Sequence, residues 1–374
     1  MKIAINTSCA VAGGAITHLR RLLPELVSRL GSDDIVVIGD AQTREKIQPP
    51  SGLEWLETDP IRGGLLGRLW FENVTLRGIL ESLGADVLFH PANFAAFRSP
   101  IPQVILIHNL APFLPAVTSG ESFGQKIRLR ILHALTLKSL SVAARTIFIS
   151  GWGRTQVIPD AAADDARMPV IAFGSEHGAK SSDPSVLSRF GLEKDQFILT
   201  VSHLYRYKKI EKLIDSVPLL RGRGIDLPIV IVGEPYDEEY SARMRARAEE
   251  SGGRILFTGG LPAPALAALM LECRQFVFTS EAENLPITLL EAMACGCAIV
   301  TNRACSMPEV CADAVLYADP ACAQTYADAI ETLESDSEAR SSLRRAAIER
   351  ASDFSWPKNG VETLAVLRNV MEAD

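Results

Sequence analysis

The sequence predicts an α/β protein with two doubly wound parallel sheets, one in each of two domains. Three observations support this prediction. The chain has 374 residues, which suggests roughly two to three domains. Short, continuous apolar runs alternate with helical patterns, as expected of parallel strands that are covered on both faces. This alternation restarts after a segment rich in glycine, serine and charge that begins near residue 174.

Six buried strands are predicted in the first half of the chain and five in the second. The first set is Ile3–Ile5, Ile35–Ile38, Val87–Phe89, Val104–Ile107, Thr146–Ile149 and Val170–Phe173. The second set is Phe197–Val201, Ile229–Val232, Ile255–Phe257, Phe276–Phe278 and Ile299–Val300. Helical patterns such as Thr17–Leu30 and Phe123–Leu140 separate them. We expect two similar domains that face each other across a cleft, with ligands beyond the carboxyl ends of the strands.

The composition excludes several classes of protein. The formal net charge is −7, and no basic tract is present, which argues against general nucleic-acid binding. Residues 1–178 carry a net charge of +1 and residues 179–374 a net charge of −8. Seven cysteines without a Cys-x-x-Cys pattern are typical of reduced, packed thiols. With no signal peptide and no apolar span apparent, we expect a cytoplasmic protein.

The segment TSEAENLPITLLEAMACGCAIVTNR, residues 279–303, carries most of the functional information. It follows a predicted strand and leads into an apolar helix that begins near Pro286 or Ile287. Between Asn284 and Asn302 the only charged residue is Glu291. Because burying an unpaired charge is costly, Glu291 needs partners, which are either protein donors or the hydroxyls of a bound ligand. The free N–H groups at the start of the helix suit a phosphate.

Glu283, followed by seven residues and then Glu291 running into LLEAMACG, resembles the signature of glycosyltransferase family four, the group 1 enzymes. The resemblance extends over essentially the whole chain. It implies the GT-B fold, with two Rossmann-like domains facing across a cleft. It also implies transfer of a sugar from a UDP- or GDP-type nucleotide sugar, with retention at the anomeric carbon. No cofactor is implied beyond this donor substrate, and because the sequence lacks Asp-x-Asp we expect no catalytic metal.

The resemblance also assigns roles to individual residues. It implies that Glu283 orients the donor sugar, that His108 contacts the sugar or the surroundings of the acceptor, and that Lys208 holds the diphosphate as the third catalytic residue. His203 stands where Arg is usual, and it is a weaker, pH-dependent cation, so we expect Arg206 to supply the missing charge. The remaining donor-binding residues are Gly13, Gly14, Asn284, Leu285, Pro286, Ile287 and Glu291, the last of which is expected to hold the ribose.

Similar enzymes have an acceptor-side domain followed by a nucleotide-sugar domain. By this resemblance residues 1–178 form the acceptor-side domain, residues 179–356 bind the nucleotide sugar, and a final helix over residues 357–374 crosses back to the first domain. The acceptor is expected to be a glycan, a lipid-linked molecule or a small molecule, as in polysaccharide biosynthesis.

A basic and apolar surface is predicted in the N-terminal half. The helical pattern over 123–140 carries Lys126, Arg128, Arg130 and Lys138 among apolar residues, and an apolar cluster at Leu65–Phe71 lies beside Arg62 and Arg68. This combination suits peripheral contact with the anionic inner face of a membrane. Ordinary solvated and buried helix faces explain the same pattern, and the sequence leaves both interpretations open.

Two other functions fit the same architecture. A nucleotide-sugar epimerase would act on the donor itself and need no acceptor, but the segment from Glu283 to Glu291 favours transfer. A non-catalytic protein that binds sugar nucleotides is the second alternative. Glu283, Glu291 and Lys208 together argue against it, whereas the unusual His203 leaves it open.

Overall fold

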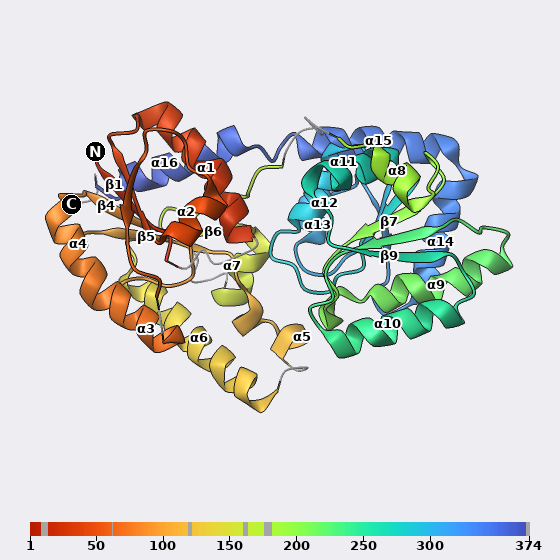
Figure 1. Cartoon of the computed structure of the whole chain (residues 1–374), viewed down its shortest axis with the longest axis horizontal. Helices are drawn as coiled ribbons and strands as arrows, with labels where there is room; N and C mark the ends of the chain where they lie inside the picture. Colours follow the sequence, from red (N-terminus) through yellow and green to blue (C-terminus); the bar gives the residue numbers. More distant parts are fainter. Residues whose placement is uncertain (9–13, 62, 119–121, 160–163, 176–181, 372–374) are drawn as a thin grey trace. The chain divides into compact units, whose positions relative to one another are not determined.

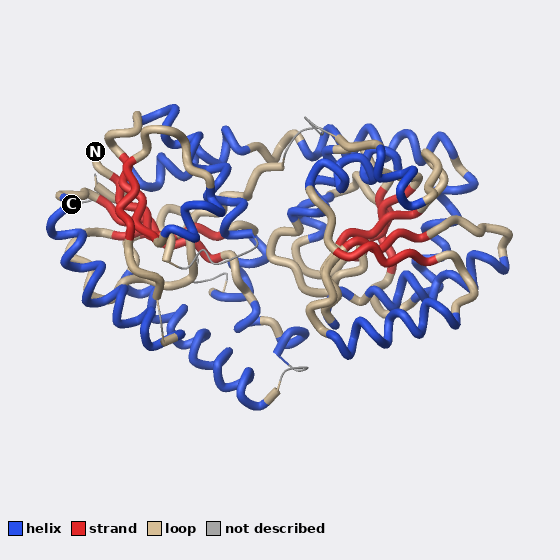
Figure 2. The backbone as a smooth tube through the Cα atoms, viewed as in Figure 1, coloured by secondary structure: helices blue, strands red, loops and turns tan. Residues whose placement is uncertain are grey.

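The computed structural model describes the chain except for residues 9–13, 62, 119–121, 160–163, 176–181 and 372–374. It divides into two units: Met1–Gly174 together with Trp356–Asp374, and Ser175–Ser355. Each unit contains one six-stranded parallel sheet flanked by helices (Figure 1; Figure 2). The boundary predicted at residue 178 and the side chain of Arg62 lie outside the described residues. In the described part of the chain, no helix is long and apolar enough to span a membrane.

The sheet of the first unit has the strand order β3-β2-β1-β4-β5-β6. Its strands are β1 (Ile3–Asn6), β2 (Ile35–Gly39), β3 (Glu54–Glu57), β4 (Val87–His90), β5 (Gln103–Ile107) and β6 (Arg145–Phe148). Ile3 of β1 pairs in register with Ile35 on one side and Val87 on the other. The order of the chain reverses between β1 and β4, and this switch point is where ligands bind in such sheets.

Helices cover the sheet of the first unit. They are α1 (Gly14–Leu30), α2 (Ala41–Ile47), α3 (Gly64–Trp70), the π-helix η1 (Phe71–Thr75), α4 (Leu76–Leu83), the 3₁₀ helix η2 (Ala111–Phe113), α5 (Pro115–Thr118), α6 (Phe123–Val142), α7 (Gly151–Val157) and α16 (Trp356–Asn369). Helix α1 buries Leu19, Leu22, Leu23 and Leu26, the spacing of one apolar helix face. The last helix, α16, packs beside α1 (Figure 1). The approach is close, because a Cβ added to Gly360 would lie 2.6 Å from the Cβ of Glu25.

The sheet of the second unit has the order β12-β11-β10-β7-β8-β9. Its strands are β7 (Ile198–Val201), β8 (Ile229–Val232), β9 (Ile255–Gly259), β10 (Gln275–Val277), β11 (Ile299–Asn302) and β12 (Leu316–Ala318). Its helices are α8 (Ser185–Phe190), the 3₁₀ helix η4 (Arg206–Lys208), α9 (Ile210–Gly222), α10 (Glu238–Glu250), α11 (Ala263–Glu272), α12 (Ile287–Ala294), α13 (Met307–Cys311), α14 (Ala323–Ser335) and α15 (Ser337–Ala351). Here the chain order reverses between β7 and β10.

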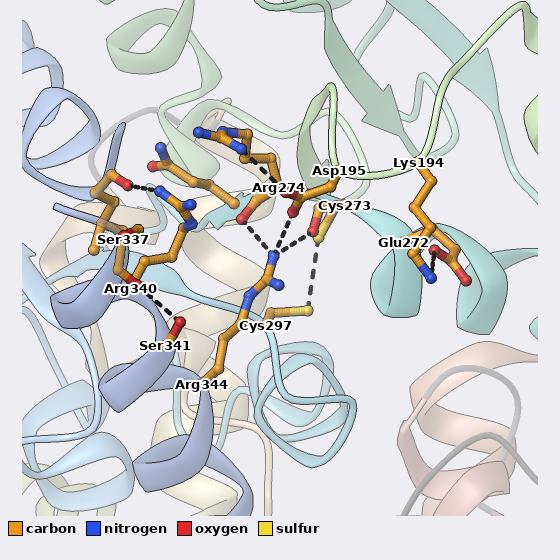
Figure 3. Close-up of polar contacts among 12 residues, drawn as sticks. Lys194, Asp195, Glu272, Cys273, Arg274, Cys297, Ser337, Arg340, Ser341 and Arg344 are labelled. Atoms are coloured by element: carbon orange, nitrogen blue, oxygen red, sulfur yellow. Dashed lines mark hydrogen bonds and ion pairs between the residues drawn. The ribbon is translucent and has the colours of Figure 1, made fainter. Parts of the chain in front are cut away.

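A network around Arg344 ties α15 to the start of β10 (Figure 3). The Arg344 guanidinium donates to Asp195 Oδ1 at 2.9 Å and to the carbonyls of Cys273 and Arg274 at 3.0 Å each. Beside it, the buried thiols of Cys273 and Cys297 are 3.7 Å apart, sulfur to sulfur. The Cys273 and Arg274 carbonyls, just before β10, therefore share a charged donor on α15. These hydrogen bonds hold α15 against the sheet.

The predicted fold class is confirmed, and most predicted strands lie within one or two residues of their observed positions. The strand predicted at Val170–Phe173 is wrong, because only Val170 forms an isolated bridge, to Phe148. Strands β3 and β12 were not predicted. Both lie at sheet edges. The β3 sequence Glu-Trp-Leu-Glu has exposed ends and lacks the apolar run of a central strand, whereas β12, Leu-Tyr-Ala, is apolar but only three residues long.

Candidate active site

Three loops of the second unit pack together at the carboxyl ends of the adjacent strands β7, β10 and β11. The hydroxyl of Thr279 donates to the Lys208 carbonyl at 2.7 Å, and the Glu281 N–H donates to the Tyr207 carbonyl at 2.9 Å. The hydroxyl of Ser306 donates to the carbonyl of Glu283 at 3.2 Å. The backbone around the candidate site is therefore held by direct hydrogen bonds between its loops.

Lys208 and Glu283, two of the predicted catalytic residues, form an ion pair. Lys208 Nζ lies 2.5 Å from Glu283 Oε1, and the two side chains are only 15% and 14% exposed. The ammonium also lies 5.1 Å from the ring centre of Tyr207 and 5.7 Å from that of Phe278, both within cation–π range. Burial lowers the pKa of Lys208, but the charge and hydrogen bond of Glu283, together with Tyr207 and Tyr205, outweigh burial and the pKa is raised. Lys208 is therefore a fixed cation.

His203 lies beside Lys208 but is not positioned as a second cation. Its Nδ1 accepts the backbone N–H of Glu234 at 3.1 Å, so Nδ1 carries no proton and the neutral ring holds its proton on Nε2. Burial, and then the charge of Lys208, lower the pKa of His203. The loop after β8 comes this close because residue 233 is glycine: a Cβ there would lie 2.0 Å from the Ser202 carbonyl oxygen.

Arg206, predicted to replace the missing charge, is directed toward two carboxylates. Its guanidinium lies 2.9 Å from Asp237 Oδ2 and 2.8 Å from Glu239 Oε2, at the start of α10. The structure does not bring Arg206 to the Lys208–Glu283 pair by any contact in the described residues. Its expected contact with the diphosphate would require these two ion pairs to open.

The remaining donor-binding residues predicted in this unit surround the start of α12. Leu285 and Pro286 are buried, and Asn284, Ile287 and Glu291 are half-buried. The buried residues of α12 are Leu289, Leu290, Ala292 and Met293, so Glu291 lies on the helix face that the core leaves open. Helix α12 begins at Ile287, four residues after Glu283. The N–H groups of its first turn are therefore close in sequence to the ion pair.

A ladder of aromatic rings beside His203 was not predicted. Tyr236 stacks on Tyr205, and Tyr205 stacks on Tyr207, each with 5.5 Å between ring centres and interplanar angles of 5° and 14°. The rings of His203 and Tyr236 meet edge to face, with 4.8 Å between their centres. Tyr236 is 61% exposed. The Tyr-Arg-Tyr of residues 205–207 was the only sign of the ladder in the sequence. The third ring, Tyr236, comes from the loop after β8, so the local sequence could not show the stacking. The rings buttress the loop that carries Lys208.

In the first unit, His108 directly follows β5 and lies at the carboxyl edge of the sheet. Asn93 fixes the backbone there, because its Oδ1 accepts the N–H groups of His108 and Asn109 at 3.3 and 3.2 Å. Burial, with the charge of Arg68, lowers the pKa of His108 to about 4. His108 is therefore neutral at physiological pH. Gly14 is exposed and begins α1, and Gly13 lies outside the described residues.

Two further histidines of this unit are buried and were not predicted as site residues. Burial lowers the pKa of both His18 and His90 to about 3. His90 ends β4, and its Nδ1 lies 3.2 Å from the Asn6 amide nitrogen at the end of β1. His18 of α1 stacks on Phe173 at 4.3 Å, and neither of its ring nitrogens has a hydrogen-bond partner among the described residues. Nearby, the Arg68 guanidinium pairs with the buried Glu72 at 2.9 Å.

The state of His203 leads to a testable prediction about pH. A neutral Nε2–H donor does not lose charge between about pH 7 and 8.5, so the affinity for UDP or GDP should stay flat over this range. His203→Arg should tighten binding about fivefold at both pH values, because a charge-assisted hydrogen bond is roughly 1 kcal/mol stronger than a neutral one. Calorimetry measures both, with His203→Gln as a neutral control for titration of the nucleotide. A wild-type affinity that weakens across this range, but not in His203→Gln, would show that His203 binds as a cation.

Comparison with known proteins shows which proteins this chain resembles. Residues 188–350 match the model of the glycosyl transferases group 1. The chain is 25% identical to O-antigen chain mannosyltransferase B of Escherichia coli over 286 residues, 75% of this chain and 73% of that protein. It is 24% identical to alpha-maltose-1-phosphate synthase of Mycolicibacterium smegmatis over 388 residues, 96% of each chain.

Solved structures share the fold over the whole chain. Anabaena HepE in complex with UDP superimposes with a TM-score of 0.75 at 19% identity, covering 99% of this chain and 100% of that one. Its complex with UDP-glucose gives a TM-score of 0.74 at 19% identity, covering 98% and 100%. A glycosyltransferase from Rickettsia africae gives 0.77 at 12% identity, covering 100% and 99%. These similarities confirm the GT-B fold.

Proposed function

We propose that this chain, whose residues 188–350 match the glycosyl transferases group 1 and whose fold is GT-B, transfers a sugar from a UDP- or GDP-type nucleotide sugar, with retention at the anomeric carbon and without a catalytic metal. The observation that carries the proposal is the Lys208–Glu283 ion pair, which lies where three loops meet at the switch point of the second sheet. The relatives named above include a mannosyltransferase and a glycosyltransferase, and none is named as an epimerase, so the epimerase alternative is set aside.

The charges of the site fit departure of a nucleoside diphosphate. As the bond to the sugar breaks, negative charge grows on the phosphate, and a preorganised cation such as Lys208 stabilises that charge. A diphosphate bound at Lys208 replaces Glu283 as part of the negative charge that faces the ammonium. The Glu283 carboxylate is then free to accept hydrogen bonds from the hydroxyls of the sugar. Glu291 on α12 holds the ribose, while His203 donates one neutral hydrogen bond to the phosphate.

The two units then have distinct roles. We assign the nucleotide sugar to the unit Ser175–Ser355, which contains Lys208, Glu283 and Glu291. The unit that includes α16 takes the acceptor side, with neutral His108 at its sheet edge contacting the sugar or the acceptor surroundings. Gly13 and Gly14 belong to the same proposed donor and acceptor contact region. The acceptor is a glycan, a lipid-linked molecule or a small molecule.

A screen of sugar nucleotides tests the proposal. A specific donor at 100 times its Kd adds about 2.7 kcal/mol of stability, so its thermal shift identifies it among UDP and GDP sugars. The donor is then incubated with and without candidate acceptors, and the anomer of the product is identified by NMR. Sugar transfer with retention supports the proposal. Conversion of the donor into an isomer without any acceptor would contradict it.

We also propose that α6 contacts the surface of an anionic membrane. Phe123, Ile127 and Ile131 are four residues apart and are 78%, 41% and 44% exposed, so they form an apolar stripe on one helix face. The helix carries four Lys and Arg residues and no Asp or Glu. An exposed apolar stripe with cations and no anions complements an interface with acidic lipids.

Flotation with vesicles tests this contact. At low salt the wild-type protein should rise with vesicles that contain phosphatidylglycerol and stay behind with phosphatidylcholine alone. Phe123→Ser with Ile127→Ser should abolish flotation because it removes the apolar stripe but keeps every charge. Leu271→Ser, which removes an exposed apolar side chain of the second unit, is the matched control and should float normally. Absence of the wild-type protein from the lipid fraction would refute the contact.

A further inference from the structure

A groove in the first unit lies between α6 and the segment that follows β5. Its lining residues are Pro112, Thr118, Lys126, Leu129, Arg130 and His133, and its volume is about 630 Å³. Lys126, Arg130 and His133 are spaced four and three residues apart, so they project from one face of the helix. The His133 ring packs against the ring of Phe113 with 4.5 Å between centres, which fixes that wall of the groove.

Among the described residues, no carboxylate compensates the positive charge in this groove. In the residues that the structure describes, no carboxylate pairs with Lys126 or Arg130, and the lining of the groove includes none. A hollow lined by charges of one sign concentrates the field and attracts the opposite charge. Apolar Leu129 and Pro112 lie beside the cations and leave room for more than a bare ion. The groove therefore has the features of a site for an organic anion.

The groove also lies close in sequence to the carboxyl end of β5, where His108 is found. His108 follows the last residue of β5, and Pro112 in η2 comes four residues later. The wall of the groove is thus a direct continuation of the strand end that positions His108. A molecule anchored in the groove by one group can extend the rest of its length toward that edge.

We propose that this groove binds a phosphate group of the acceptor, so that the acceptor is a phosphate monoester or diester. This inference rests on the proposed sugar transfer, which requires an acceptor. The Arg130 guanidinium offers a planar fork for two phosphate oxygens, Lys126 adds a compact charge, and His133 adds a ring N–H. The phosphate belongs either to a soluble sugar phosphate or to a lipid whose chains follow the apolar stripe of α6.

Binding is measured with the full chain and without any nucleotide sugar. Glycerol 3-phosphate, a soluble monoester, is titrated by calorimetry, and vesicles of phosphatidylcholine with or without phosphatidic acid are tested by flotation. Arg130→Gln should weaken binding about tenfold, the loss expected for a hydrogen bond between charged groups. Arg128→Gln removes the same charge from the same helix outside the groove, and it should weaken binding less than about twofold.

Saturable binding of glycerol 3-phosphate supports the proposal with a soluble source, and binding only to phosphatidic acid vesicles supports it with a lipid source, provided that Arg130→Gln is the weaker variant. Failure of both probes to bind overturns the proposal, and so does equal weakening by Arg130→Gln and Arg128→Gln. Turnover of the nucleotide sugar is measured separately. A protein that transfers sugar but binds neither probe overturns only the groove, whereas phosphate binding without transfer overturns only the proposed function.

Discussion

Lys208→Met is expected to lower turnover by about a hundredfold to a thousandfold, or roughly 3–4 kcal/mol of transition-state stabilisation. The methionine keeps most of the side-chain volume beside Tyr207 and Phe278 but removes the charge. The loss should be larger in turnover than in donor binding, because the charge on the leaving phosphate is greatest in the transition state. Steady-state rates, together with calorimetric affinity for the donor, separate the two effects.

A folding control is needed because Lys208 and Glu283 are both largely buried. Removing one partner of such a pair leaves the other charge uncompensated, which destabilises the fold. The double variant Lys208→Met with Glu283→Gln has no uncompensated charge and should be more stable than Lys208→Met alone. If folded Lys208→Met retains wild-type turnover, Lys208 does not stabilise the leaving group.

Acid should destabilise the first unit steeply, because His18, His90 and His108 are buried and neutral. The pKa values of these side chains are lowered from 6.5 to about 3, 3 and 4. Below about pH 6.5 the unfolded chain binds protons that the folded chain does not, so stability falls as pH falls. Each histidine contributes a slope that approaches 1.4 kcal/mol per pH unit. From pH 7 to pH 5 the three together cost about 6 kcal/mol.

Tryptophan fluorescence reports this unit alone, because all four tryptophans lie in it: Trp55, Trp70, Trp152 and Trp356. Urea unfolding at several pH values then gives the slope. His18→Phe keeps a ring against Phe173 and should reduce the slope by about a third. His203→Gln, in the other unit, is the control and should leave it unchanged. A transition midpoint that stays constant between pH 7 and pH 5 would contradict the buried, neutral state of these histidines.

The fold could be predicted from the sequence wherever a strand is central, since apolar runs such as Ile35–Ile38 exist only because both sheet faces are covered. Edge position alone does not explain why β3 and β12 were missed, because the edge strands β6 and β9 were predicted. The β3 sequence Glu-Trp-Leu-Glu has polar ends, and β12 is only three residues long. Val170–Phe173 shows the opposite error. It is apolar, yet only Val170 pairs, as a single bridge to Phe148.

The sequence singled out individual residues for the candidate site, but it did not show the contacts between them. Glu283 and Lys208 were each singled out from local patterns, yet their pairing depends on β7 and β10 being neighbours, a consequence of the crossover between them. The neutral state of His203 depends in the same way on a backbone N–H supplied by the loop after β8. Arg206 was expected beside the phosphate because of its place in the chain, but the carboxylates at the start of α10 hold it.

Glu283→Gln separates sugar transfer from nucleotide binding more directly than any other change. The glutamine keeps the shape of the side chain and removes the charge that pairs with Lys208, so the ammonium is freer to bind a diphosphate. The affinity for UDP or GDP, measured by calorimetry, should be unchanged or tighter, while turnover falls about a hundredfold or more. Wild-type turnover in a folded Glu283→Gln protein would contradict the assignment of this ion pair as the centre of a glycosyltransferase site.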